Sequence, residues 1–223
     1  MRILKQLVSS LALLLSVTVV LFGCDGDKGT NPGGGGNNTG GNSTGGGSGN
    51  KCGVDGTAKS CKTVEIGGQT WFAENLNRKT DSSWCYNDAD SNCAKYGRLY
   101  TWNAAKKACP SGWKLPDTAD WGLLIDKAGG YSTAGTKLKS SSGWNNFAGE
   151  LIVGTDYYGF SALPGGGGGN TYGGAGLYGY WWTSTEGYSN YAYRLSMHYS
   201  SEKVYSDESS MIGSRNSVRC IKN

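Results

Sequence analysis

Residues 97–116 read GRLYTWNAAKKACPSGWKLP, and this stretch does most to decide the fold. From Gly97 to Cys109, apolar side chains recur at three-residue intervals, which predicts an amphipathic helix that ends at the following proline. After the second proline, Asp117 is placed to cap another helix, which carries apolar residues on one face and stops at Gly129. The stretch therefore predicts two successive helices with a cysteine between them.

Strand signals lie on both sides of these helices. Upstream, residues 61–72 hold two short apolar runs around a Gly-Gly pair, which predicts a hairpin. Downstream, residues 191–200 alternate with a period of two, and residues 204–208 have the composition of a returning strand. Residues 217–221 are expected to form a last strand. The order predicts an α+β fold with two helices and a mostly antiparallel, loop-rich sheet.

Six cysteines follow residue 50, and an even number in an exported chain is typical of a disulfide framework. Six cysteines allow fifteen sets of pairings. Two pairs are close in sequence and enclose short polar loops, so each pair is expected to bond locally. The remaining two cysteines would then tie the first helix to the last strand. The expected bonds are Cys52–Cys61, Cys85–Cys93 and Cys109–Cys220.

Six ordered blocks of sequence carry a resemblance to a known family. They are residues 68–76 (GQTWFAENL), 96–102 (YGRLYTW), 109–116 (CPSGWKLP), 159–166 (GFSALPGG), 180–186 (YWWTSTE) and 218–220 (VRC). From about Thr63 to the C-terminus the chain resembles the Fibrobacter succinogenes major paralogous domain. The resemblance implies an exported, often lipid-anchored domain of C-type-lectin-like fold, distantly similar to formylglycine-generating sulfatase-modifying enzymes. It supplies no established catalytic or binding residue.

The N-terminus has the pattern of a bacterial lipoprotein signal. A short basic start precedes an apolar run over residues 7–22. The run ends in Leu-Phe-Gly-Cys, and an apolar residue at −3 with a small residue at −1 marks Cys24 for lipidation after removal of residues 1–23. The alternative is a transmembrane anchor, but a span needs about 20 apolar residues and this run is shorter.

Residues 25–50 form a linker in which 12 of 26 residues are glycine and nearly all others are Asn, Ser or Thr. Such a segment has too little to bury to offset its ordering entropy, so we expect a flexible spacer with an end-to-end distance of about 25–30 Å. The expected organisation is a lipoprotein signal peptide (1–23), a lipidated cysteine with the flexible linker (24–50), and a lectin-like domain (51–223).

This organisation predicts a lipid-anchored protein of the bacterial cell envelope. Asp25 directly after Cys24 would favour inner-membrane retention in enteric bacteria, but other phyla do not follow that rule. We expect the outer membrane or the cell surface rather than the inner membrane. The N-terminal lipid would make the membrane one partner of the protein.

Charge and ligand chemistry restrict the other partners and cofactors. A net charge of +4 without a long basic run does not favour nucleic acid. One histidine, His198, and no CxxC motif argue against zinc. The oxygen-rich turn at residues 87–92 has ligands suited to calcium, but an Asx-rich turn closed by a disulfide explains it better. Glycines at 165–169 replace the calcium-binding carboxylates of sugar-binding lectins, so no cofactor is expected.

No catalytic constellation emerges from the sequence. An oxidase would need a reactive thiol pair, whereas every cysteine after residue 50 has an expected partner. His198 lacks a nucleophile beside it. Several carboxylates are present, but the sequence places no two of them at the separation a glycosidase requires. These are Glu74, Asp117, Asp120, Glu186, Glu202, Asp207 and Glu208. We therefore expect a protein that is not an enzyme.

Aromatic residues provide the remaining signal, with fourteen tyrosines and eight tryptophans. Six tryptophans are expected in the core: Trp71, Trp102, Trp113, Trp121, Trp181 and Trp182. Four tyrosines lie among Gly, Ser and Asn, so we expect most of them to be exposed and to bind a ligand: Tyr172, Tyr178, Tyr188 and Tyr191. The predicted function is recognition of polysaccharide or of a surface partner. The alternatives are a structural protein that packs against other envelope proteins and a formylglycine-generating-type enzyme.

Overall fold

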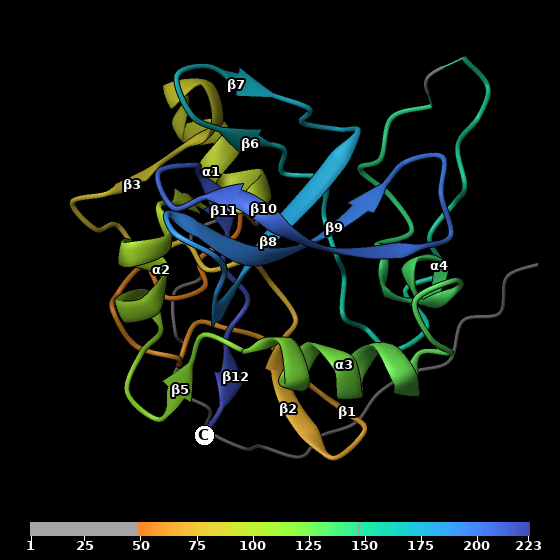
Figure 1. Ribbon diagram of the computed structural model, residues 1–223, viewed down its shortest axis with the longest axis horizontal. Coiled ribbons are helices and arrows are strands. Elements are labelled where there is room, and N and C mark those ends of the chain that lie inside the picture. The colour runs from red at the N-terminus through yellow and green to blue at the C-terminus, as the bar shows by residue number, and fades with distance from the viewer. Residues whose placement is uncertain (1–48, 147) are drawn as a thin grey trace, which may run out of the picture. The chain divides into compact units, whose positions relative to one another are not determined.

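Two sheets organise the part of the chain that the computed structural model describes, residues 49–146 and 148–223 (Figure 1). The predicted signal peptide, Cys24 and nearly all of the predicted linker lie outside these residues. The smaller sheet has the order β1 (Thr63–Ile66), β2 (Gln69–Phe72), β12 (Ile221–Lys222), β5 (Trp113–Lys114). The larger has the order β10 (Val204–Met211), β9 (Tyr191–His198), β8 (Tyr178–Glu186), β11 (Asn216–Ser217), β4 (Leu99–Tyr100), β3 (Ser83–Trp84).

Strand pairing within the two sheets is antiparallel except between β11 and β8. A separate two-stranded hairpin joins β6 (Gly167–Gly168) and β7 (Tyr172–Gly173). The helices are η1 (Tyr86–Asp88, a 3₁₀ turn), α1 (Asp90–Tyr96), α2 (Trp102–Ala108), α3 (Thr118–Lys127) and α4 (Ala134–Leu138). The α+β class and the mostly antiparallel sheets are confirmed. None of these helices has the length and apolar character that a bilayer crossing requires.

The predicted number of helices was wrong, because the described residues contain four α-helices rather than two. Helix α1 begins inside the loop that was interpreted as a polar turn, and α4 has five residues, too few to show a period. The helix predicted from Gly97 starts later, at Trp102. Leu99 and Tyr100 instead form β4, since they pair with β3 on one side and β11 on the other.

The cap of α3 was predicted correctly and is stronger than expected. The Asp117 side chain accepts a hydrogen bond from the Asp120 backbone N–H, and the Asp120 side chain accepts one from the Asp117 N–H. This capping box satisfies two N–H groups that the first turn would leave unpaired. The helix ends as predicted, with Gly129 in the left-handed region (φ 107°).

Two strand predictions need correction. The alternation in β9 holds at Leu195 and Met197, which are buried, but Tyr191 is exposed and Ala192 is buried. The phase changes because both neighbouring strands, β8 and β10, are irregular opposite this end of β9. The last strand expected over residues 217–221 is divided between β11 and β12, because the chain crosses there from one sheet to the other.

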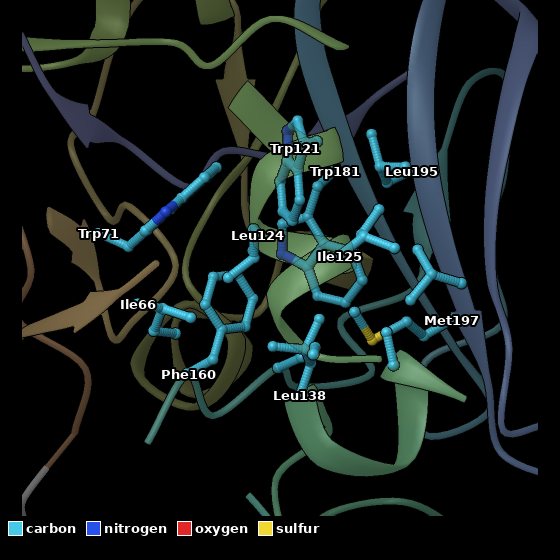
Figure 2. Packing of buried hydrophobic residues seen from close by; sticks show 14 of the residues in the cluster. Ile66, Trp71, Trp121, Leu124, Ile125, Leu138, Phe160, Trp181, Leu195 and Met197 are labelled. Carbon is cyan, nitrogen blue, oxygen red and sulfur yellow. The ribbon is translucent and has the colours of Figure 1, made fainter. Parts of the chain in front are cut away.

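The core has two clusters on opposite sides of the strands. Consecutive residues point to opposite faces of a strand, and both faces are covered here. On β2, Trp71 joins one cluster and Phe72 the other; on β8, Trp181 and Trp182 divide in the same way. Figure 2 shows the first cluster, in which Trp121 from α3 lies 4.9 Å from the ring of Trp71.

Five of the six tryptophans expected in the core are buried: Trp71, Trp102, Trp121, Trp181 and Trp182. Trp113 is half-buried and packs against the ring of Phe72 at 4.2 Å. Three disulfides join the pairs expected from the spacing: Cys52–Cys61, Cys85–Cys93 and Cys109–Cys220. The last closes 111 residues and fixes the end of α2 to the residue before β12.

A buried arginine connects the segments between the strands. The Arg219 guanidinium donates to the backbone carbonyls of Phe72, Phe160 and Ser161 and to Oδ1 of Asn75. Burial lowers the pKa of Arg219. Asn75 is also buried, and its Oδ1 accepts from Trp181 Nε1 at 2.8 Å. Residues 72–75, 160–161 and 219 are therefore held together by one charged group.

A buried lysine does the same on the other side of the domain. Lys139 Nζ donates to the carbonyls of Ile152, His198 and Ser201 at 2.7, 3.2 and 3.0 Å. Burial lowers the pKa of Lys139 to about 8, and the nearby charge of Glu202 opposes this shift. Lys139 thereby joins the end of α4 to the loop after β9.

Candidate binding site

The face of β8 and β9 opposite the first core cluster carries a continuous row of packed side chains. Tyr178 and Tyr180 are two residues apart, so they share one face of β8, and their rings are parallel with centroids 5.7 Å apart. His198 packs against Tyr178 at 4.4 Å, and the Arg194 guanidinium lies 4.4 Å from the Tyr180 ring. We call these four residues the aromatic row. Stacking on both sides fixes the two tyrosines.

The segment 166–174, which we call the glycine hairpin, lies against this row. An ideal Cβ on Gly167 would come within 3.2 Å of the Tyr180 ring, and one on Gly174 within 2.9 Å of the Tyr178 ring. Gly174 also has a φ of 79°, which side-chain-bearing residues rarely adopt. Glycine is required here because the backbone approaches the tyrosine rings too closely for a side chain.

Asp88 of η1 and Arg215, which packs on Trp84 of β3, hold the glycine hairpin in place. The Tyr172 hydroxyl donates to Asp88 at 2.6 Å and accepts from Arg215 Nη1 at 3.0 Å. The Arg215 guanidinium also lies 3.9 Å from the Trp84 ring. Burial, followed by the hydrogen bond to Asp88, raises the pKa of Tyr172. Two backbone hydrogen bonds between Gly168 and Arg215, at 2.9 and 2.8 Å, complete the attachment.

The turn considered as a calcium site is held by protein contacts. Asp88 accepts the hydrogen bond from Tyr172, and the Asn92 side chain donates to the Tyr86 carbonyl at 2.8 Å. Across residues 49–146 and 148–223, no group of three or more His, Cys, Asp or Glu side chains is arranged to hold a metal ion.

The glycine hairpin and the aromatic row enclose an open pocket of about 440 Å³, which we call the hairpin pocket. Its polar lining comes from four segments: Asn170, Thr171, Tyr172, Tyr178, Tyr180, Arg194, Ser214 and Asn216. The hydroxyls of Tyr178 and Tyr180 form no hydrogen bond with the described residues. The pocket therefore offers hydroxyl and amide groups that a ligand can use.

Charge inside the hairpin pocket is balanced. Arg194 lines it and forms an ion pair with Asp207, with 3.1 Å between Nη2 and Oδ2. The Arg194 Nε is buried and has no partner among the described residues. Burial raises the pKa of Tyr180, while the charge of Arg194 opposes that shift. A neutral, hydrogen-bonding ligand fits this environment better than a highly charged one.

Only two of the four predicted tyrosines belong to this site. Tyr172 and Tyr178 line the hairpin pocket, but both are half-buried rather than exposed. Tyr188 and Tyr191 are exposed, at 91% and 39%, and lie at the other end of β8 and β9. Nine residues of strand span about 27–30 Å, so the two pairs are too far apart to form one site.

Sequence reasoning missed the other contributors. Tyr180 and Arg194 could have been found, since each follows the period-two pattern of its own strand. Ser214 and Asn216 come from the segment after β10 and carry no local signal. Their position depends on the pairing of β11 with β4 and β8, which joins segments far apart in sequence.

Residues 64–222 match the family described as the Fibrobacter succinogenes major domain. The chain belongs to this family. The matched range includes the aromatic row, the glycine hairpin and Arg219, and it confirms the resemblance from about Thr63 onward. No curated protein and no solved structure matches the chain. The major domain therefore contains both the buried network and the candidate site.

Proposed function

We propose that this protein is a cell-envelope lipoprotein whose major domain binds polysaccharide without catalysing a reaction. The observation that carries the proposal is the hairpin pocket, where the hydroxyls of Tyr178 and Tyr180 are not used by the described protein atoms. Sugars present many hydroxyls on a largely apolar ring, and a tyrosine offers an apolar body with a polar tip. Pockets of 300–1,000 Å³ are typical of small-ligand sites.

The mode of binding follows from which tyrosine surfaces are free. Neighbouring groups cover the ring faces of Tyr178 and Tyr180, so these rings contact a ligand through their edges and hydroxyls. Asn170 contributes an amide group that can both donate and accept hydrogen bonds, whereas the Asn216 amide already donates to Ser210 Oγ at 3.4 Å. A sugar in the hairpin pocket would therefore be recognised mainly by its hydroxyl pattern.

Three features support the rest of the proposal. The six described cysteines are all in disulfides, which favours a binding function over an oxidase that needs a free, reactive thiol pair. The disulfide between α2 and the last strand is consistent with a C-type-lectin-like fold. The signal, Cys24 and the glycine-rich linker indicate a lipid-anchored domain displayed on the outer membrane or cell surface.

Two adjacent glycines provide a matched test of the hairpin pocket. We expect Gly174→Ala to weaken binding on an array of oligosaccharides by about tenfold or more, because its Cβ forces the hairpin away from Tyr178. Gly173→Ala should bind normally, since no atom lies within 4 Å of that Cβ. Equal binding by both variants and the unmodified chain, or no binding by the unmodified chain, would contradict the proposal.

A second pair of variants tests the hydroxyls. Tyr180→Phe should weaken binding about three- to tenfold, the usual contribution of one hydrogen bond. Tyr188→Phe is the control, because that tyrosine lies far from the hairpin pocket. Thermal unfolding should be unchanged in both, since neither hydroxyl bonds to a described residue. Unchanged binding by Tyr180→Phe would show that this hydroxyl does not bond to the ligand.

A further inference from the structure

A second hollow, of about 380 Å³, lies between α4 and the loop that follows Val153. Its lining consists of Thr133, Thr136, Lys137, Thr155, Tyr157 and Glu202. None of these residues lines the hairpin pocket. We call it the Tyr157 hollow.

Tyr157 is highly exposed on a loop whose neighbouring residues are hydrogen-bonded. Its side chain is 73% exposed, whereas its neighbour Tyr158 packs edge-on against it at 4.8 Å. The preceding residue, Asp156, adopts a φ of 48°, which is uncommon for a residue other than glycine. The Asp156 carboxylate stabilises this turn by accepting hydrogen bonds from Ser161 N and Oγ at 2.6 and 2.5 Å. The loop thus presents a large ring to solvent at a backbone cost.

The base of the loop is attached to α4 and to the end of α3. Thr155 N donates to the Thr136 carbonyl at 2.8 Å, and Tyr158 Oη donates to the Lys127 carbonyl at 2.9 Å. These bonds place Tyr157 beside the threonine side chains of the hollow. The backbone that carries the ring is therefore ordered before any ligand arrives, which lowers the entropy cost of binding.

Three polar side chains of the hollow have no hydrogen-bond or ion-pair partner among the described residues, whereas the hydroxyls of Thr133 and Thr155 donate to the carbonyls of Gly129 and Thr136. Thr136 Oγ1 is buried and forms no hydrogen bond with the described residues, an arrangement that costs free energy unless another group satisfies it. Lys137 and Glu202 carry opposite charges, and neither forms a salt bridge with a described residue. A donor and an acceptor are thus both available near one exposed aromatic ring.

The geometry points to a second saccharide-binding site, in which the apolar face of a sugar ring stacks on Tyr157. Its hydroxyls would bond to Lys137 and Glu202 and, after a rotation of the side chain, to Thr136. Opposite charges on the lining favour a neutral sugar, because a charged one would be repelled by either Glu202 or Lys137. The site is independent of the hairpin pocket, so the domain would hold a polymer at two points and gain avidity.

The test is affinity electrophoresis of the full chain in gels that contain soluble xylan, mixed-linkage β-glucan or galactomannan. We expect Tyr157→Ala to weaken binding to at least one polymer about tenfold, since the stacking surface is removed. Tyr188→Ala is the matched control, because it removes an even more exposed tyrosine that lies outside both sites. Identical migration of Tyr157→Ala and the unmodified chain in every gel would overturn the proposal.

Two further variants separate this site from other effects. In a Gly174→Ala chain, whose hairpin pocket is disrupted, Tyr157→Ala should weaken the remaining binding about tenfold further; equal binding by the Gly174→Ala chain and the double variant would overturn the proposal. Thr136→Val should weaken binding without lowering the melting temperature, because a hydroxyl with no protein partner is lost. Unchanged affinity in Thr136→Val would contradict the hydroxyl contact.

Discussion

Polar groups in the buried network around Arg219 are hydrogen-bonded within the described part of the protein, whereas several polar groups around the two surface hollows are not. Arg219 is fully buried and donates to three carbonyls and one amide oxygen. In contrast, the hydroxyls of Tyr178 and Tyr180 make no hydrogen bond with the described protein atoms. A buried polar group must be satisfied by the protein, whereas a group beside a hollow can be satisfied by water or by a ligand. Unpaired polar groups around a preformed hollow therefore indicate where binding is expected.

Outside this network, one buried polar group of the described core has no hydrogen bond. Trp121 Nε1 is buried and has no hydrogen-bond partner among the described residues. Its ring packs against those of Trp71, Phe160 and Trp181 instead. Apolar packing rather than hydrogen bonding therefore holds Trp121 in place, in contrast to Arg219 and Asn75.

Removing the Cys109–Cys220 disulfide, which lies beside Arg219 in the sequence, should cause the largest loss of folding stability. In the loop-entropy model, the Cys109–Cys220 bond, which closes 111 residues, contributes about 4–5 kcal/mol. The Cys52–Cys61 bond, with a separation of 9, contributes about 2.5 kcal/mol. Urea unfolding of the two double Cys→Ser variants measures the difference. Equal loss of stability would show that the long bond does not organise the core as described.

Replacement of Arg219 should have the next largest effect. Arg219→Met should lower the free energy of unfolding by about 3 kcal/mol or more, because it leaves several buried acceptors without a donor. The control is Lys114→Met, which breaks an ion pair of 2.8 Å whose lysine is exposed. Such surface pairs contribute about 0–1 kcal/mol. Similar losses of unfolding free energy in both variants would show that the buried hydrogen bonds of Arg219 stabilise the fold no more than a surface ion pair does.

Protonation of His198 should have the smallest effect on stability. His198 is the chain's one histidine, and burial lowers its pKa below 6.5, with the charge of Lys139 adding to the effect. The folded state then binds a proton less readily than the unfolded state, so stability falls as the pH drops through 6.5. NMR titration should give a midpoint below 6.5, and the stability difference between the unmodified chain and His198→Gln should decrease from pH 7 to pH 5. A midpoint at or above 6.5 would contradict the packing of His198 in the aromatic row.

Local signals in the sequence were sufficient for much of the fold. The cap at Asp117, the hairpin of β1 and β2, and the three disulfide pairs each depend on residues close together or on simple spacing. Short elements were missed, since the five residues of α4 are too few to show a helical period. The phase change in β9 was missed because irregularities in its neighbours cause it.

The candidate site was only partly predictable. Composition drew attention to tyrosines near a glycine-rich segment, and two of the four belong to the hairpin pocket. Tyr157 drew no attention, because nothing in its local sequence indicates that Asp156 turns the ring outward. Ser214 and Asn216 were missed for the related reason that chain crossing, rather than local pattern, places them.

By itself, the sequence determined the α+β class, the disulfide pairing and the family, and it predicts a lipoprotein signal at Cys24. These depend on composition, spacing and short-range periodicity, which are properties of the chain before it folds. Only the tertiary structure decided that Arg219 meets Asn75, 144 residues away, and that the glycine hairpin lies on the rings of Tyr178 and Tyr180. Such contacts arise when distant segments pack together, and the packing geometry of the whole domain sets them rather than any local pattern.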